Sequence, residues 1–297
     1  MNQHPGTPDS SGRTAPLATR CRVNPALRAR LTELPEVPAR GGRRPFVVVN
    51  MAMSADGKTA TANRAVSSFG SRHDLAHLYD LRATADAVMC GARTAEAGNV
   101  HLGPGPARYR RLRLRRGLAE YNLRVLVSGS GSLNPRAPIF RQRFSPLLVL
   151  TTAQAGRRRL ARLRQVADMV VVSGEIELDW RRALHWLRTR WNVRRLVCDG
   201  GGELNAALFA AGVVDEVHLT LCPLVLGGDN APTIADGEGA KTLGDAAPFR
   251  WHRIRRRGAE LFCVLVTKDT DAEISCELGQ GPPNSPLHSM ELPRKSP

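Results

Sequence analysis

Residues 194–227 read RRLVCDGGGELNAALFAAGVVDEVHLTLCPLVLG, and the order of patterns in this segment indicates the fold class. It opens on an apolar run that is typical of a buried strand, and three consecutive glycines follow. The next segment, ELNAALFAAG, has helical periodicity, and VDEVHLTLCPLVLG is again apolar. A strand, a helix and a second strand in this order predict parallel strands joined by a crossover helix.

The same alternation extends over residues 45–267. Together with the runs 194–200 and 214–227, eight strands are predicted, the others at 46–53, 86–91, 123–129, 146–151, 168–174 and 261–267. Segments of helical period lie at 73–83, 93–98, 156–166, 179–190 and 203–212. This pattern predicts an α/β fold with a mixed, mostly parallel sheet of about eight strands and helices on both faces. Two edge-like strands at the end are expected to close the sheet antiparallel. Pro223 inside the last-but-one run indicates an edge or a bulge rather than a central strand.

Composition limits the class of protein. With 297 residues, 42% hydrophobic and 24% charged, the chain can bury a core without disulfides. No run approaches about 18 apolar residues and the first residues lack the apolar segment of a secretory signal, so we expect a soluble, cytoplasmic protein. The six cysteines have no CxxC or His-Cys spacing, and no metal site is predicted.

The net charge of +16 lies mainly in the predicted fold, because residues 45–267 hold 32 basic and 19 acidic side chains. Arginine-rich runs at 108–117, 156–165 and 253–257 suit phosphorylated small molecules or nucleic acid, although a solvated helix face is the ordinary interpretation. Aromatic residues make up only 5%, which disfavours a stacking platform for single strands. Residues 1–44 are expected to be a flexible basic extension and residues 268–297 a flexible tail.

Three predicted strands end in segments that suit a dinucleotide. MCGART (89–94) brings a glycine turn, an arginine and a threonine to a helix start, although alone it reads as an ordinary turn. CDGGGE (198–203) has more glycines than a plain turn needs, which favours close approach of a ligand to the backbone; it is not the GxGxxG fingerprint of a Rossmann domain. LVSGSGSLNP (126–135) offers hydroxyl groups that could bind a 2′-phosphate, or is a flexible loop.

The first predicted strand runs into NMAMSADGKTAT (50–61), a turn that could serve a substrate or be a surface hairpin. In one register, NMAMSADGK (50–58), GSRHDLAHLYDLRATADAVMCGART (70–94) and CDGGGELNAALFAAGVVDEVHLTLCPLVLGG (198–228) resemble the dihydrofolate-reductase-like superfamily, and within it the reductase domain of riboflavin biosynthesis. The resemblance covers about residues 45–240. It implies a dihydrofolate-reductase-like three-layer fold, NADPH as cofactor, a homodimer, and hydride transfer that converts the ribosyl group of a ribosylamino-pyrimidine phosphate to ribityl.

The resemblance also implies residue roles. Lys58 would hydrogen-bond or protonate the oxygen that becomes a hydroxyl, and Asp199 would bind pyrimidine donors. The implied substrate-binding residues are Ser54, Asp56, Arg82, Asn99 and Arg108, with Arg82 facing the phosphate. The implied cofactor-binding residues are Ala52, Gly91, Arg93, Thr94, Ser128, Ser130, Gly200, Gly201, Gly202 and Glu203. Arg93 and the serine loop favour NADPH over NADH.

The sequence departs from the family on the substrate side. Gly98, Asn99 and Val100 stand where an Asp-Asp-Pro or Asp-Asn-Pro turn is usual, and Gly105 stands at the position of an arginine that Arg108 could replace. Asp199 replaces the glutamate of the usual Glu-Gly-Gly. The basic segment 108–122 could cover the substrate phosphate, but an exposed helix is the preferred interpretation.

Several functions stay open at this point. The zinc-deaminase signature HxE…PCxxC is absent, so a separate deaminase is expected in the pathway. The chain could be a 5-amino-6-(5-phosphoribosylamino)uracil reductase or could act on the diamino-pyrimidine before deamination. A same-fold reductase of another small molecule such as dihydrofolate is the closest alternative, with Asp74 as its helix acid. A non-catalytic basic module for nucleic acid is the third.

Overall fold

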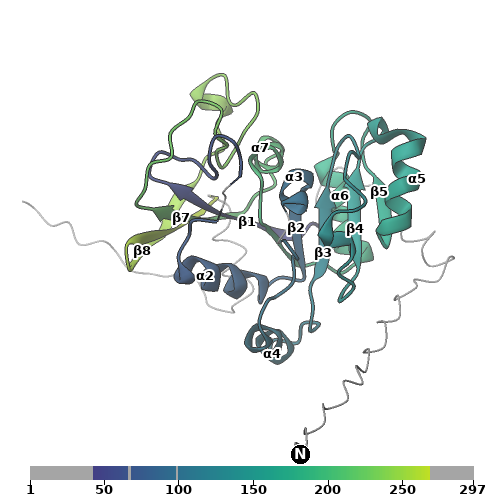
Figure 1. The fold of residues 1–297 in the computed structure, drawn as a ribbon, viewed down its shortest axis with the longest axis horizontal. Helices are drawn as coiled ribbons and strands as arrows, with labels where there is room; N and C mark the ends of the chain where they lie inside the picture. The colour runs from purple at the N-terminus through teal and green to yellow at the C-terminus, as the bar shows by residue number, and fades with distance from the viewer. Residues whose placement is uncertain (1–42, 66–67, 98–99, 268–297) are drawn as a thin grey trace, which may run out of the picture.

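The structure is a computed structural model of the chain and describes residues 43–65, 68–97 and 100–267 (Figure 1). The extensions expected up to residue 42 and from residue 268 therefore lie outside the described residues, as do Gly98 and Asn99. In the described part nine strands form one sheet of order β5-β4-β3-β2-β6-β1-β7-β9-β8. Their bounds are β1 Phe46–Ser54, β2 Ala87–Gly91, β3 Leu123–Val127, β4 Leu147–Thr151, β5 Met169–Val172, β6 Arg195–Cys198, β7 Glu216–Cys222, β8 Arg250–Arg257 and β9 Glu260–Val266.

Strands β1 to β7 are all parallel, so their carboxyl ends meet along one edge of the sheet. Parallel strands are buried on both faces, which explains why their sequences read as continuous apolar runs. Strand β9 is antiparallel to β7, and β8 is antiparallel to β9. The α/β fold with a mixed, mostly parallel sheet is thus confirmed.

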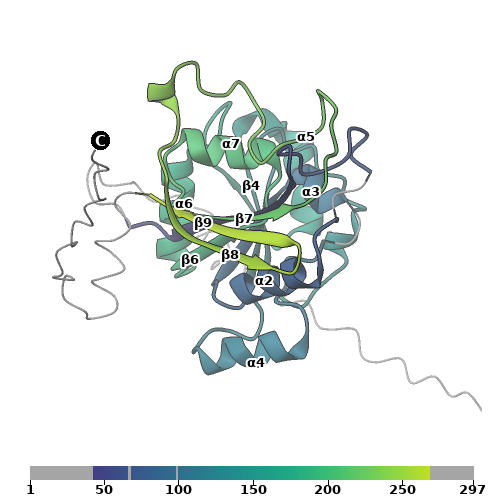
Figure 2. The same ribbon diagram turned by 90° about the vertical axis from the view of Figure 1, so that its left-hand side faces the viewer.

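Helices cover both faces of the sheet. They are α2 Arg72–Arg82, α3 Ala92–Glu96, α4 Ala107–Arg115, α5 Gly156–Val166, α6 Trp180–Arg190 and α7 Gly202–Ala210. Leucine and tryptophan side chains of α6 and α7 pack against one face, whereas buried residues of α2, α3 and α5 pack against the other. Figure 2 shows α6 and α7 on one side of β7, β9 and β8, with α2 on the opposite side and α4 beyond it. These are the three layers that the sequence predicts.

Two predictions about the last strands are wrong in detail. Strand β7 ends at Cys222, so Pro223 lies after it, and β7 is an internal strand between β1 and β9. The edge strand is β8, which the sequence analysis treated only as the basic run 253–257. Residues 251–257 are exposed, because β8 has one neighbouring strand and its side chains reach solvent on both faces. A strand exposed in this way has no apolar alternation by which to recognise it.

The basic segment 108–122 contains helix α4, and most of its arginines are exposed. Arg113 is the buried arginine of this segment: it is 1% exposed, and its guanidinium donates to the carbonyl oxygens of Arg82, Ala85 and Ala119. The bonds to Arg82 and Ala85 satisfy carbonyls at and just after the carboxyl end of α2, and the bond to Ala119 reaches a residue that follows α4. Burial lowers the pKa of Arg113 to about 10, so it stays charged at neutral pH. Helix α4 is therefore joined to the end of α2 through Arg113, while most of its other arginines are exposed.

Candidate active site at the carboxyl ends of the strands

A notch opens in the carboxyl edge of the sheet between β1 and β6. The two strands pair from Phe46↔Arg195 to Val49↔Cys198, where β6 ends. Strand β1 continues beside β7 as far as Ser54↔Cys222. The notch is thus bordered by the second half of β1 and by the glycine loop that follows β6. Ligands of open parallel sheets bind at such carboxyl ends.

Asp199 is the first residue beyond β6 and is buried at the base of the notch. Arg82, the last residue of α2, donates to Asp199 Oδ2 from Nε at 3.0 Å and from Nη2 at 2.7 Å, and its Nη1 donates to Gly103 O at 2.9 Å. The two side chains are only 6% and 8% exposed. Burial raises the pKa of Asp199, and the Arg82 charge opposes this rise. All three guanidinium nitrogen atoms of Arg82 thus donate to acceptors of the protein. In this geometry Arg82 does not face a substrate phosphate as expected.

The other oxygen of Asp199 has no hydrogen-bond partner among the described residues. The same holds for Asn50 Oδ1, which lies on β1 next to Asp199 and is 8% exposed. A buried acceptor without a partner is costly, and native structures contain few. The notch therefore presents two buried oxygen atoms to a donor. Asn50 could not be identified from the sequence, because a single polar residue in an apolar strand has no distinctive spacing.

The glycine loop joins β6 to α7 and contacts the end of β2, since Gly91 N donates to Gly200 O at 2.9 Å. Gly200 has φ +81°, and a Cβ atom there would overlap Met51; a Cβ at Gly202 would overlap Asp236. Packing within the protein thus accounts for two of the three glycines. A Cβ at Gly201 would meet only the Thr94 hydroxyl, at 3.2 Å. Gly201 is therefore the glycine that leaves the backbone open to a ligand.

Arg93 of α3 and Glu203 of α7 form an exposed ion pair across this loop. The predicted cofactor residues of the segments MCGART (89–94) and CDGGGE (198–203) are thereby brought to one place, with Thr94 beside Gly201. A phosphate group near Arg93 would have to compete with the Glu203 carboxylate. Because both side chains are more than half exposed, the ion pair itself is weak.

The serine loop after β3 lies two strands from β6 along the same edge. Ser130 Oγ and Ser132 Oγ are 2.8 Å apart, and Ser128 is buried with its N–H donating to Leu150 O. Arg159 of α5 donates to Ser130 O at 2.9 Å, and its side chain is exposed. In the sequence, Arg159 is distinguished only as part of the arginine-rich run 156–165. Its contact with the serine loop adds a guanidinium to the predicted 2′-phosphate site.

The predicted substrate turn at the end of β1 is tied to the loop after β7. Asp56 accepts from Ser54 Oγ at 2.6 Å and from the backbone N–H groups of Leu226 and Gly227 at 3.1 and 2.7 Å. The Ser54 hydroxyl, followed by the two N–H groups, lowers the pKa of Asp56 to about 2. Lys58 Nζ is 3.4 Å from Ala231 O, so the ammonium group lies along this loop. Asp56 thus organises the turn, and Lys58 is its only ammonium group.

Arg108 was expected to replace an arginine that the family usually has at the position of Gly105. It is exposed on α4, and its guanidinium lies over the Tyr109 ring, 4.7 Å from the centroid. Gly105 has φ +76°, and a Cβ atom there would overlap the ring of Tyr79. An arginine therefore does not fit at position 105, which gives a physical reason for this departure from the family. Asn99 lies outside the described residues.

A buried polar network lies between α2 and the sheet beside the notch. His77 Nε2 is 2.9 Å from His218 Nδ1, and His218 Nε2 is 2.6 Å from Glu216 Oε1, which also accepts from Arg195 at 2.9 Å. Burial, followed by the nearby His218 and arginine charges, lowers the pKa of His77 to about 4. Burial acts to raise the pKa of Glu216, but the hydrogen bond from His218 and the Arg195 charge outweigh it and hold that pKa at about 2.

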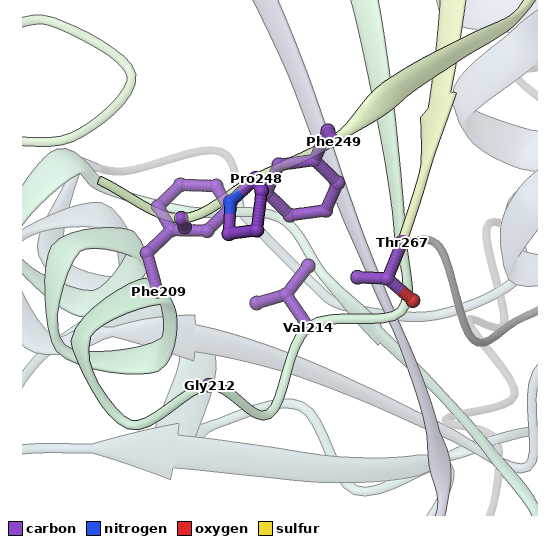
Figure 3. Close-up of a pocket in the computed structure, with 7 residues that line it drawn as sticks. Phe209, Gly212, Val214, Pro248, Phe249 and Thr267 are labelled. Atoms are coloured by element: carbon purple, nitrogen blue, oxygen red, sulfur yellow. The ribbon is translucent and has the colours of Figure 1, made fainter. Parts of the chain in front are cut away.

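A separate hollow of about 330 Å³ lies beyond the carboxyl end of α7, the end opposite to the glycine loop. Figure 3 shows the rings of Phe209, Pro248 and Phe249 gathered about Val214, with Thr267 at the side. Its lining is almost entirely apolar and has no titratable side chain. It offers no group for acid–base or phosphate chemistry, and the notch is the candidate active site.

The described ranges lack two features on which other functions would depend. No helix in them is both long and apolar enough to cross a membrane. Nor do three or more His, Cys, Asp or Glu side chains of these ranges gather in a group that could hold a metal ion.

Comparison with known proteins gives consistent matches. The profile of the RibD C-terminal domain matches residues 45–262. The 2,5-diamino-6-ribosylamino-4(3H)-pyrimidinone 5′-phosphate reductase of Methanothermobacter thermautotrophicus is 31% identical over 228 residues, which cover 76% of this chain and 99% of that protein. The enzyme of the same name from Archaeoglobus fulgidus is 33% identical over 195 residues, covering 66% of this chain and 88% of the relative.

Among solved structures, RibD of Acinetobacter baumannii superposes with a TM-score of 0.59 at 20% identity, over 75% of this chain. The present chain spans only 58% of that RibD chain. At this identity the similarity shows the fold alone, and the fold is the one expected from the sequence.

Proposed function

The chain belongs to the RibD C-terminal domain family, and we propose that it is an NADPH-dependent reductase of riboflavin biosynthesis, acting on 2,5-diamino-6-ribosylamino-4(3H)-pyrimidinone 5′-phosphate. The product would be the corresponding ribitylamino compound. The observation that carries the proposal is the buried Asp199 carboxylate at the base of the notch, held by Arg82 through one oxygen and leaving the other for a ligand. The relatives that share most of their length with this chain have this substrate in their names.

Conversion of a ribosyl to a ribityl group requires few functional groups from a protein. Carbon C1′ gains a hydride, the bond between C1′ and the ring oxygen O4′ breaks, and O4′ takes up a proton. When bound, NADPH supplies the hydride. The chain must bind and orient the pyrimidine and place a proton donor near O4′. We assign the proton donor to Lys58 and the binding of pyrimidine N–H groups to Asp199.

The carboxyl edge of the sheet suits an extended dinucleotide. From the serine loop after β3 to β1 there are three inter-strand steps, roughly 14 Å at about 4.8 Å each. The open backbone at Gly201 and the N-terminus of α7 would bind the pyrophosphate. The cofactor contacts that we assign along this edge are Ala52, Gly91, Arg93, Thr94, Ser128, Ser130, Gly200, Gly201, Gly202 and Glu203, with Arg159 added at the serine loop.

The substrate contacts that we assign are on the other border of the notch. Ser54 and Asp56 hold the turn that carries Lys58, and the exposed guanidinium of Arg108 is available for the phosphate. Asn99 keeps its expected substrate role without a structural account. Arg82 is reassigned from the phosphate to positioning Asp199, because its three nitrogen atoms donate to acceptors of the protein.

The proposal extends to the partners of the enzyme. Because the sequence has no zinc-deaminase signature, a separate protein would remove the amino group in the pathway. The homodimer implied by the resemblance also remains part of the proposal. Its test is the mass of the purified protein in solution, measured by light scattering.

Turnover tests the proposed function. The purified chain is incubated with NADPH and the diaminopyrimidinone phosphate, and loss of NADPH absorbance is compared with formation of the ribityl product by mass spectrometry. Equal amounts of both are expected, with no turnover of dihydrofolate. Absence of product with the pyrimidine phosphate, under conditions where the protein binds NADPH, would overturn the proposed substrate.

Lys58→Met separates the proton-donor role from binding. A positioned general acid contributes about 10²- to 10⁴-fold to a rate, so we expect kcat to fall by about that factor while the Kd of the substrate changes little. Normal turnover in Lys58→Met would remove Lys58 from the chemistry. Lys241→Met, at an exposed lysine, is the matched control and should retain wild-type kcat.

A further inference from the structure

We propose that residues 269–278 of this chain bind along the open edge of β8 as an added strand, with their acidic side chains beside the arginines of β8. The proposal concerns an interaction surface away from the notch and does not depend on the proposed function. Residues 269–278 lie outside the described part of the chain, whereas the surface that would bind them lies within it.

Strand β8 is the outermost strand of the sheet and pairs only with β9 in the described part of the chain (Figure 2). In an antiparallel pair, alternate residues direct their backbone N–H and C=O groups away from the partner strand. Over its eight residues, β8 thus has a row of backbone donors and acceptors along its outer edge. It contains no proline or glycine that would interrupt pairing. This edge can therefore accept one more strand.

One face of β8 carries three arginines. Arg253, Arg255 and Arg257 alternate along the strand, and Arg255 pairs with Phe262 of β9. The Phe262 ring contacts the His77 ring of α2, so these arginines lie on the α2 face of the β8–β9 hairpin. All three are exposed, and no ion pair among the described residues includes them. This face thus offers three positive charges to an acidic partner.

The opposite face of β8 carries apolar side chains that reach solvent. Trp251 and Ile254 are 59% and 55% exposed. Their partners on β9 are Leu265 and Cys263, which lie on the face that packs under α6 and α7. Charged side chains alone can keep an edge strand from associating, and an exposed tryptophan and isoleucine work against that role. The two faces of β8 therefore favour a strand that is acidic on one side and apolar on the other.

Residues 269–278 read DTDAEISCEL and have this pattern. Four of the five odd positions are acidic, whereas the even positions hold Thr, Ala, Ile, Cys and Leu. Strict alternation over such a length is typical of a strand with one polar and one apolar face. The segment contains no lysine or arginine, and the glycines and prolines of GQGPP (279–283) end the pattern. Beside β8, its acids would lie on the arginine face and Ile274 on the face of Trp251.

The length of chain after β9 permits this placement. Val266, the last residue of β9, pairs with Arg250, the first residue of β8, so the chain leaves the sheet at the end where β8 begins. The outer edge of β8 is two inter-strand steps from β9, roughly 10 Å. Residues 267–270 can span about 13 Å. Residues from Asp271 onward can therefore run beside β8 and in the same direction.

Charge favours this occupant over a second copy of the sheet. Pairing of β8 with β8 of another copy would bring two rows of arginines together, and like charges on neighbouring strands destabilise the pair. Residues 269–278 bring four negative charges instead. Because they are joined to β9 by a short connection, their effective concentration at the edge is high.

Hydrogen exchange of the β8 amides in the full chain, measured by NMR, tests the proposal. The N–H groups of residues 250–257 that face away from β9 should be protected in the wild type. Asp271→Lys/Glu273→Lys replaces attraction to Arg253 and Arg255 by repulsion, so these N–H groups should exchange about tenfold faster. The N–H groups of β8 that bond to β9 should keep their rates, which would show that the hairpin is still folded.

Charge reversal on the strand is the complementary variant. Arg253→Glu/Arg255→Glu should lose the same protection. The combination of both pairs of substitutions should restore most of it, because the facing charges are again opposite. Glu291→Lys is the matched control, since it reverses an acid outside residues 269–278 and should leave the exchange rates of β8 unchanged.

Three results would contradict the proposal. Outward N–H groups of β8 that exchange as freely in the wild type as in Asp271→Lys/Glu273→Lys would show that the edge has no partner strand. Protection that is equally strong in both proteins would exclude residues 269–278 as the occupant. Protection that grows with protein concentration and persists in a chain ending at Lys268 would assign the edge to a second copy. Turnover of the pyrimidine phosphate is a separate measurement, so none of these results bears on the proposed function.

Discussion

Arg82 on α2 binds Asp199 through a single carboxylate oxygen, with Nε and Nη2 at 3.0 and 2.7 Å from Oδ2. This contact joins the carboxyl end of α2 to the end of β6. It neutralises a carboxylate in a buried position and leaves the second oxygen at the base of the notch without a partner in the described part of the chain. The proposed chemistry depends on this arrangement, because a mobile or protonated Asp199 would not present a fixed acceptor.

Removal of Arg82 should destabilise the fold more than removal of the whole ion pair. Arg82→Met leaves the Asp199 carboxylate buried without its counter-charge, which typically costs about 3–5 kcal/mol in the free energy of unfolding. The double variant Arg82→Met/Asp199→Leu has no buried charge and should recover part of that loss. Urea denaturation measures both, and an Arg82→Met protein as stable as the wild type would contradict the structural role of the pair.

The loop after β7 should lose its position when Asp56 loses its charge. Asp56→Asn has one acceptor oxygen fewer for Ser54, Leu226 and Gly227, so we expect KM for the pyrimidine phosphate to rise about tenfold with a small change in Tm. Asp229→Asn, at an exposed acid nearby in the same loop, is the control and should behave as wild type. Unchanged KM in Asp56→Asn would show that the turn keeps its geometry without the carboxylate.

The free energy of unfolding should decrease as the pH is lowered through the range where His77 titrates in the unfolded chain. In the fold its pKa is about 4, below the ordinary 6.5, so the unfolded state binds more protons between these values. The contribution is complete above pH 6.5 and is lost as the pH falls through about 4. His77→Leu should flatten the dependence of unfolding free energy on pH in this window, whereas His252→Leu, on exposed β8, should not. Equal slopes for the wild type and His77→Leu would contradict the burial argument.

Arg159 should contribute to the preference for NADPH over NADH. The Arg159 guanidinium lies at the serine loop and is exposed. Arg159→Ala should therefore weaken NADPH binding by about fivefold, because an exposed ionic contact contributes about 1 kcal/mol. NADH binding should not change, because NADH lacks the 2′-phosphate. Arg162→Ala on the same helix is the control. Fluorescence titration with both nucleotides measures the difference; equal weakening of NADPH and NADH would assign Arg159 to another part of the cofactor.

Most of the fold follows from local patterns in the sequence. The parallel strands are apolar on both faces, and helices such as α5 begin and end where their periodicity predicts. Strand β8 could not be recognised, because its residues 251–257 are exposed and their polar character reflects solvent on both faces. Pro223 was assigned to the inside of a strand because a sequence run does not show where the ladder stops.

The site was only partly predictable. Glycine and serine segments at strand ends are visible in the sequence, and the parallel sheet explains why they meet at one edge. The partner of Asp199 is 117 residues away, and the contacts of Asp56 lie 170 residues away in the loop after β7. Such pairs depend on how strands that are not consecutive in the sequence are aligned with each other, and local sequence patterns do not show that alignment. Asn50 emerged only from its position opposite the end of β6 and from its unpartnered oxygen.

Transfer of deuterium from the cofactor shows whether this chain reduces the ribosyl group by hydride transfer. The protein is incubated with the diaminopyrimidinone phosphate and NADPH that carries deuterium at the transferable position of the nicotinamide, and the product is examined by NMR. We expect a ribityl product with a single deuterium, located at C1′. A product without deuterium at C1′, or oxidation of the cofactor with no ribityl product, would contradict hydride reduction of the ribosyl group by this chain.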